Sequence, residues 1–150
     1  GTVFDELRTQ SVVLEAMILK PNMVLAGLDC AQQQANETVA AATLTCLRRN
    51  VPAAVAGIAF LSGGQSGELA SARLNAINAR AAAAGQSPWP LVFSFARAIQ
   101  RPALGVWRGE EANVIAAQAV LLHRASCNHA ALRGAYRDSM ENGPRLPRAS

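Results

Sequence analysis

Short apolar runs that alternate with longer alanine-rich amphipathic segments constrain the fold of this 150-residue chain more than any other feature. The runs span residues 12–19, 54–61 and 91–95. They are rich in Val, Ile and Phe with little alternation, which is typical of strands covered on both faces. Their starts lie roughly 35 to 45 residues apart, which leaves room for a crossover helix each time. The pattern predicts three β-α units with parallel strands.

Two helices are expected between these runs. The first extends over residues 37–49, with Asn36 as its cap, an acid in its first turn and two arginines in its last. The second begins at residue 67 or 68, ends near Arg80 and has Ser66 as its cap. The apolar stripe of this second helix is expected at Leu69, Ala72, Ala76 and Ala79.

After the third run, a short helical turn is expected at residues 97–100 and a long helix at about 110–135. Residues 138–150 contain glycine and prolines but few apolar side chains, which indicates a loose tail. Residues 1–137 would then form the folded part of the chain. The apolar stripe of the long helix is expected at Ile115, Ala119 and Leu122.

Three consecutive β-α units form an open sheet whose two edge strands would be long and apolar. A closed eight-stranded β/α barrel takes about 250 residues. We therefore expect an α/β fold in which this chain supplies the last three units of a (β/α)8 TIM barrel, with the C-terminal helix and tail. Five strands would be missing.

Composition excludes several classes of protein. The longest apolar run, residues 51–61, is about half of the ~20 residues that a membrane-spanning helix needs. Asp5 and Glu6 stand where a secretory signal would be basic and then apolar, which favours a cytoplasmic protein. The net charge is +4, but the basic residues are scattered, so nucleic-acid binding is not expected.

The cysteines and histidines give no sign of a metal centre or a disulfide framework. There are three cysteines and no C-x-x-C pair, so buried free thiols are expected. His123 and His129 lie six residues apart, which is too far for two ligands on one helix face. No metal site is predicted.

Lys20, the single lysine, ends the first apolar run and shares a strand face with Ala16 and Ile18. Inside a barrel, desolvation would disfavour the ammonium form and free the amine for attack on a carbonyl. The alternative is a lysine that extends from a strand end to solvent.

Ser62, Gly63 and Gly64 follow the second run, and Ser94 and Arg97 follow the third. Glycines let a backbone approach a phosphate closely, serine adds a donor, and arginine neutralises the charge. The alternatives are an ordinary glycine turn and a solvated arginine in the first turn of a helix. In a β/α barrel, such strand ends hold the active site.

The lysine, the Ser-Gly-Gly and the Ser-x-x-Arg motifs on consecutive strand ends closely resemble the C-terminal part of class I fructose-1,6-bisphosphate aldolase. The resemblance extends over most of residues 12–135. It is carried by residues 14–15, 19–24, 48–52, 60–66, 74–78 and 93–98.

The resemblance implies a lyase of glycolysis that reversibly cleaves fructose 1,6-bisphosphate to dihydroxyacetone phosphate and glyceraldehyde 3-phosphate. Lys20 would form the Schiff base, with no metal or organic cofactor. The implied partners are a sugar-phosphate substrate, the missing N-terminal half of the barrel and other copies of the chain in a tetramer. The resemblance places the C1 phosphate of the substrate at Ser62, Gly63, Gly64, Ser94 and Arg97.

Two departures from the family pattern affect these expectations. Ala96 stands where the family usually has glycine, which would crowd the phosphate. The strands that carry the family's aspartate, glutamate and second lysine are absent, so the isolated segment is expected to be nearly inactive. The alternative is a non-catalytic, aldolase-like half-barrel that self-associates and binds sugar phosphates.

Overall fold

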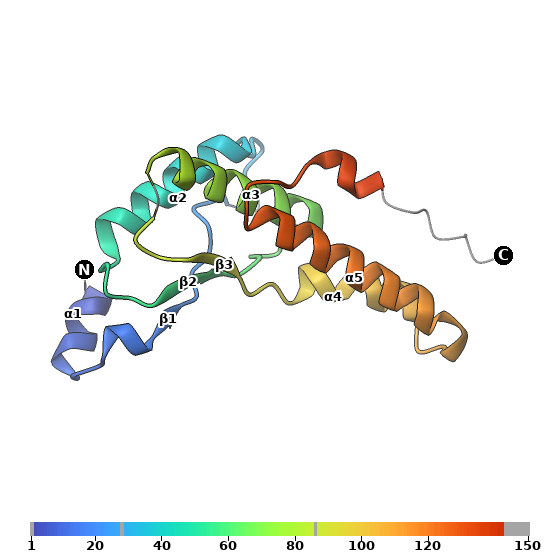
Figure 1. Ribbon diagram of the computed structural model, residues 1–150, viewed down its shortest axis with the longest axis horizontal. Coiled ribbons are helices and arrows are strands. Elements are labelled where there is room, and N and C mark those ends of the chain that lie inside the picture. The colour runs from blue at the N-terminus through green and yellow to red at the C-terminus, as the bar shows by residue number, and fades with distance from the viewer. Residues whose placement is uncertain (1, 28, 86, 143–150) are drawn as a thin grey trace.

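A small parallel sheet organises the computed structural model (Figure 1). Its strands are β1 (Ile18–Leu19), β2 (Gly57–Phe60) and β3 (Leu91–Phe93), in the order β1-β2-β3. Both pairings are parallel, which confirms the predicted β-α connections. The structure describes residues 2–27, 29–85 and 87–142.

Helices account for most of the remaining chain. In Figure 1, α2 and α3 lie together along one side of the sheet, while α4 and α5 pack against each other beyond the end of β3. α5 also contacts α3, so the two helix pairs join into one layer. The bounds are α1 Thr2–Thr9, η1 Leu14–Ala16, α2 Asn36–Asn50, α3 Gly67–Ala83, α4 Arg97–Trp107, η2 Glu111–Asn113, α5 Val114–Ala131 and η3 Asp138–Asn142.

The core lies between the sheet and the helices α2 and α3. Ile58 and Phe60 of β2 and Leu74 of α3 are fully buried there. The opposite face of the sheet is open, because the side chain of Ile18 is 66% exposed and that of Val92 is 36% exposed. The expectation that the strands are covered on both faces is therefore wrong for the described part of the chain.

The first strand is much shorter than predicted. Of the expected residues 12–19, only Ile18 and Leu19 form β1, and Leu14–Ala16 form a turn of 3-10 helix. Val12 and Val13 at the start of this segment are exposed, although both residues are apolar. A strand needs a partner to satisfy its backbone, and β2 pairs only with the end of this segment.

The helix ends show which capping signals were informative. The Ser66 hydroxyl accepts a hydrogen bond from the Leu69 amide at 3.2 Å, as predicted for the start of α3. Asn36 is the first residue of α2 rather than its cap, and Ala35 at the cap position gives no side-chain bond. The expected turn at residues 97–100 extends into α4. The long helix is split into η2 and α5.

Both predicted apolar stripes are at least partly wrong. On α5, Ile115 is 81% exposed and Leu122 is 69% exposed. On α3, Leu69 is exposed. The buried face of α5 consists of small and polar side chains, namely Ala117, Arg124, Cys127, Asn128, Ala130 and Ala131.

Two expectations about the end of the chain and its thiols also need correction. Residues 138–142 form η3 and are held to α5, so they are not loose, while residues 143–150 of the expected tail lie outside the described residues. Cys127 is buried as expected, but Cys30 and Cys46 are exposed.

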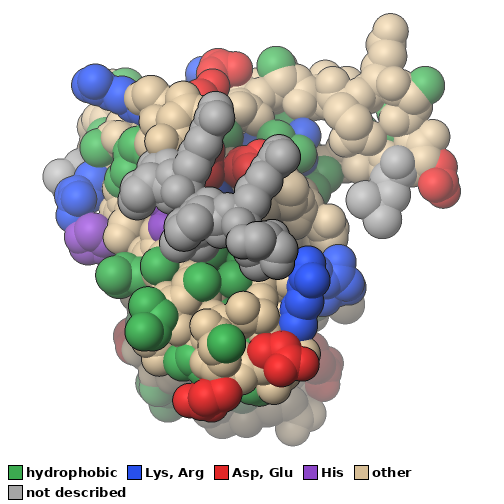
Figure 2. Space-filling view, turned by 90° about the vertical axis from the view of Figure 1, so that its right-hand side faces the viewer, with side chains coloured by type: hydrophobic (Ala, Val, Ile, Leu, Met, Phe, Trp, Pro, Cys, Tyr) green, Lys and Arg blue, Asp and Glu red, His purple; other side chains and the backbone are tan. Residues whose placement is uncertain are grey.

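The outer end of the α4 and α5 pair presents an apolar surface. Figure 2 shows hydrophobic side chains gathered over this end of the molecule. Leu104 and Trp107 of α4 and Leu121 of α5 are partly exposed and line a groove of about 360 Å³.

Within the described ranges, no helix is long and apolar enough to cross a membrane.

Candidate functional site at the strand ends

Lys20 directly follows β1 and is exposed. By strand alternation it lies on the same face as Ile18, which is the open face of the sheet. The described residues do not form the apolar interior that the sequence led us to expect around its amine. The next carbonyl, that of Pro21, accepts a hydrogen bond from the Leu61 amide at 3.0 Å. This bond ties the segment after β1 to the segment after β2.

The Ser-Gly-Gly motif forms a tight turn against this first segment. Ser62 is buried, and its carbonyl accepts from the Gln65 amide at 3.1 Å. Gly63 and Gly64 both have positive φ, at 59° and 86°. A Cβ on Gly63 would lie 2.5 Å from Oδ1 of Asn22, so the backbone of the turn packs directly on that side chain. The structure thus brings Ser62 and Gly63 beside the loop that carries Lys20.

Replacement of Gly63 by alanine is expected to destabilise the fold by roughly 1 to 3 kcal/mol, because a strained φ and a collision with Asn22 combine. Gly64→Ala is the matched control, since its φ is also positive but nothing lies within 4 Å of its Cβ. Urea unfolding of both variants measures the difference. Equal losses for the two variants would show that the contact with Asn22 contributes nothing.

A cavity of about 490 Å³ lies between the N-terminal ends of α3 and α4. Gly64 and Arg97 line it together, and so do Arg101 and the α3 cap Ser66. Arg124 and the acid Glu68 also line the cavity. Helix N-termini present free amide groups and favour anions, and Arg97 and Arg101 add positive charge, which the Glu68 carboxylate partly offsets. Lys20, Ser62, Gly63 and Ser94 are not among the residues that line this cavity.

The two helices approach closely at this cavity because of Gly67 and Pro102. Pro102 lies inside α4 and has no N–H to donate to the carbonyl of Ala98, four residues earlier. That carbonyl faces Gly67, where an added Cβ would lie only 2.7 Å from it. The third strand end is fixed separately, since the Ser94 amide donates to the Phe60 carbonyl at 2.8 Å.

Ala96 occupies the N-cap position of α4 with φ −104° and ψ −80°. This φ is negative, so the conformation does not require glycine. The alanine is therefore accommodated by the backbone at the position where the family pattern has glycine. Its side chain is exposed.

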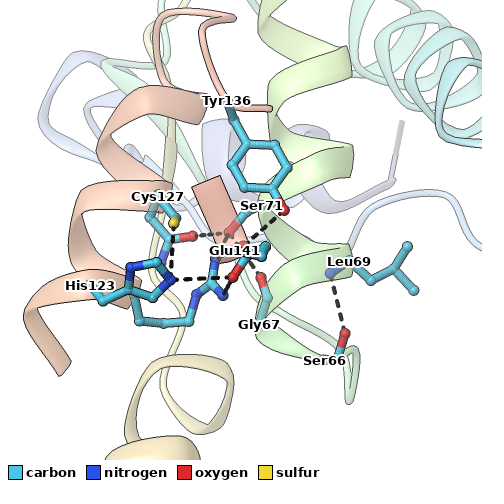
Figure 3. Close-up of polar contacts among 10 residues, drawn as sticks. Ser66, Gly67, Leu69, Ser71, His123, Cys127, Tyr136 and Glu141 are labelled. Atoms are coloured by element: carbon cyan, nitrogen blue, oxygen red, sulfur yellow. Dashed lines mark hydrogen bonds and ion pairs between the residues drawn. The ribbon is translucent and has the colours of Figure 1, made fainter. Parts of the chain in front are cut away.

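A buried polar network lies next to the cavity (Figure 3). Arg124 of α5 is 5% exposed and donates to both carboxylate oxygens of Glu141, each at 2.7 Å. It also donates to the Ser71 hydroxyl at 3.0 Å, and the Tyr136 hydroxyl donates to Glu141 at 2.8 Å. Burial alone would raise the pKa of Glu141, but the hydrogen bonds from Arg124 and Tyr136 outweigh it and lower the pKa to about 2. Glu141 is therefore ionised at neutral pH.

Sequence reasoning missed two arginines that line the cavity. Arg101 follows Arg97 by four residues, and this spacing on one helix was a usable signal. Arg124 gave no such signal, because a single arginine in a long helix is typical of a solvated helix face. Only the tertiary structure shows that it is buried and paired.

Comparison with known proteins connects this geometry to one family. The family described as "Glycolytic: Fructose-bisphosphate aldolase class-I" matches residues 1–146. Fructose-bisphosphate aldolase 2 of Plasmodium berghei is 46% identical over 91% of this chain and 36% of its own length. Fructose-bisphosphate aldolase C-B of Danio rerio is 48% identical over 89% of this chain and 36% of its own.

A solved structure shows the same similarity in three dimensions. It is the Plasmodium falciparum fructose-bisphosphate aldolase in complex with TRAP and a small-molecule inhibitor. The TM-score is 0.84 at 47% identity, over 90% of this chain and 38% of that one. The chain thus spans a little more than a third of the length of the relatives it matches.

Proposed function

The chain belongs to the class I fructose-bisphosphate aldolase family, and on this basis we propose that it supplies the covalent lysine and the phosphate-binding elements of a Schiff-base aldolase. The reaction is the reversible cleavage of fructose 1,6-bisphosphate in glycolysis. One observation carries the proposal: three parallel strands end at the same edge, where Lys20, the Ser62 turn and the start of α4 follow them.

We propose that five further strands complete a (β/α)8 barrel around this sheet, with residues 1–137 in the barrel domain. The open face of the sheet, with Ile18 and Val92, would then become the barrel interior. β1 and β3 are the two outer strands of the described sheet, so each has a free edge for a neighbour. Closure would also remove Lys20 from water.

In the proposed reaction, the amine of Lys20 bonds to the C2 carbonyl carbon of the ketose, and the carbonyl oxygen leaves as water. The resulting iminium accepts the electron pair of the C3–C4 bond as that bond breaks and releases glyceraldehyde 3-phosphate. The remaining enamine takes up a proton, and hydrolysis frees dihydroxyacetone phosphate and the lysine. Proton transfers fall to groups on the other strands of the barrel. No metal or organic cofactor takes part.

We propose that the C1 phosphate is held between the Ser62 turn and the N-terminus of α4. Gly63 and Gly64 would offer backbone amides, Ser62 and Ser94 hydroxyl groups, and Arg97 a charged pair of donors. The cavity that Gly64 and Arg97 line supports an anion beside this place, while Ser62, Gly63 and Ser94 lie outside its lining. The active enzyme is proposed to be a cytoplasmic homotetramer.

Replacement of Arg97 by alanine tests the phosphate assignment. It is expected to weaken binding of dihydroxyacetone phosphate roughly 10- to 100-fold, the usual effect of losing hydrogen bonds to a charged group. Binding of dihydroxyacetone, which has no phosphate, is expected to stay the same. Isothermal titration calorimetry measures both ligands.

Arg101→Ala is the matched control, because it removes the same charge from the same cavity. A much smaller effect than that of Arg97→Ala is expected. Equal effects of the two substitutions would show a diffuse positive field rather than a phosphate site at Arg97. No effect of either would contradict the assignment.

A further inference from the structure

Three potential metal ligands from separate parts of the sequence meet beside the Arg124 network (Figure 3). His123 and Cys127 lie one turn apart on α5, and Glu141 comes from η3. The Nε2 atom of His123 lies 3.7 Å from Sγ of Cys127 and 3.4 Å from Oε2 of Glu141. All three ligand atoms lie within 4.8 Å of one another.

These separations suit one tetrahedral ion. With bonds of about 2.0 to 2.3 Å to nitrogen, oxygen and sulfur, ligand atoms around zinc lie about 3.3 to 3.8 Å apart. The two contacts of His123 already fall in this range. The third pair, Cys127 and Glu141, needs at most a small closing movement. A sulfur, an imidazole nitrogen and a carboxylate oxygen form a donor set that zinc accepts.

The surroundings hold the ligands in place and leave one side open. Arg124 and Tyr136 fix the Glu141 carboxylate, which is 19% exposed. Cys127 is buried, whereas the His123 side chain is 33% exposed and gives access from solvent. With Cys127 as a thiolate, the thiolate and the Glu141 carboxylate carry two negative charges. The Arg124 guanidinium carries one positive charge, so the net charge of the three groups is negative and attracts a cation.

We propose that His123, Cys127 and Glu141 form a zinc site, with water in the fourth position. On binding, the Cys127 thiol releases its proton to solvent as the sulfur–metal bond forms. The ion would fasten η3 to α5 and so stabilise the end of the described chain. None of the three ligands lines the cavity at Arg97, although Arg124 borders both places, and the zinc site does not depend on the proposed aldolase activity.

Cobalt, a spectroscopic substitute for zinc, provides the test. The chain with Cys30 and Cys46 replaced by serine is titrated with Co²⁺ and then with Zn²⁺. One equivalent of Co²⁺ is expected to produce a thiolate charge-transfer absorption and intense tetrahedral bands, which Zn²⁺ abolishes. The melting temperature is expected to rise with Zn²⁺. A folded protein that shows no stoichiometric absorption would overturn the proposal.

Three variants separate this site from other metal-binding groups. Cys127→Ala is expected to lose the charge-transfer band, and a band that persists would overturn the proposal. If that variant does not fold, His123→Gln decides, because its side chain is partly exposed. Loss of an outer-shell partner lowers metal affinity roughly 10- to 100-fold, and the His123→Gln variant, which loses a ligand, is expected to lose more zinc affinity than that. Unchanged affinity contradicts the site. His129→Gln, at an exposed histidine that contacts Arg133, is the control and is expected to bind normally.

Discussion

Borohydride reduction in the presence of dihydroxyacetone phosphate is expected to attach the three-carbon unit to Lys20 and to no other side chain. Borohydride reduces the iminium to a stable secondary amine, so the label survives digestion and peptide mass analysis. Lys20 is the only lysine in the sequence, which makes a lysine label unambiguous. The signal depends on an exposed amine at the strand end, where the structure places it.

Lys20→Arg is the control for this labelling, because it keeps the positive charge and removes the nucleophile. The label is expected to disappear completely in this variant. Labelling of the N-terminal amine alone in the parent chain would contradict the role of Lys20. If dihydroxyacetone phosphate binds but is never trapped, the non-catalytic half-barrel explains the chain better than the aldolase segment does.

The sheet could be predicted because its signal is local. β2 and β3 lie within short apolar runs, and Ser66 caps α3 through its own side chain. Because the strands are parallel, their C-terminal ends lie at the same edge of the sheet. This edge then predicts where Lys20 and Arg97 lie. What failed was the length of β1, since the number of residues that pair depends on a neighbouring strand.

The buried faces of α3 and α5 could not be predicted from hydrophobic stripes. Alanine carries little hydrophobic signal, so an alanine-rich helix looks similar on every side. Here the buried positions include Ser71 and Arg124, and Arg124 donates a hydrogen bond to the Ser71 hydroxyl. Leu122, the more apolar residue, faces outward. Ser71 and Arg124 are 53 residues apart in the sequence, so no local pattern indicates that this hydrogen bond turns Arg124 toward α3.

The proposed zinc site shows what residue spacing along a sequence can and cannot indicate. His123 and His129 lie six residues apart, a spacing that does not place two metal ligands on one helix face. The four-residue spacing between His123 and Cys127 does place both on one helix face, and it was readable from the sequence. The place of Glu141 could not be predicted from the sequence, because residues 138–142 were expected to be loose and instead fold back onto α5.

Replacement of Arg124 by methionine is expected to lower the free energy of unfolding by about 3 to 5 kcal/mol, as removal of one partner from a buried ion pair does. Methionine has similar length, so the main change is that the largely buried carboxylate of Glu141 loses its charged partner. Urea unfolding at neutral pH measures the loss. Arg101→Met, on the exposed side of α4, is the control and is expected to change stability by about 0.5 kcal/mol at most.

The same ion pair predicts how stability depends on pH. The pKa of Glu141 is about 2 in the folded chain against 4.5 as its ordinary value, so the folded state favours the ionised form. Its contribution is complete above pH 4.5 and is lost as the pH falls toward 2. At 1.36 kcal/mol per pKa unit, the loss is up to about 3 kcal/mol.

Glu141→Gln is expected to remove most of this acid dependence, because glutamine does not titrate, while it lowers stability at neutral pH by leaving Arg124 unpaired. Unfolding free energies measured from pH 7 to pH 3 distinguish the parent chain from the variant. An identical acid slope in both would contradict the depressed pKa and the stabilising role of the ion pair. Since Glu141 belongs to η3, a flattened slope would also show that residues 138–142 fold together with α5 rather than as an independent tail.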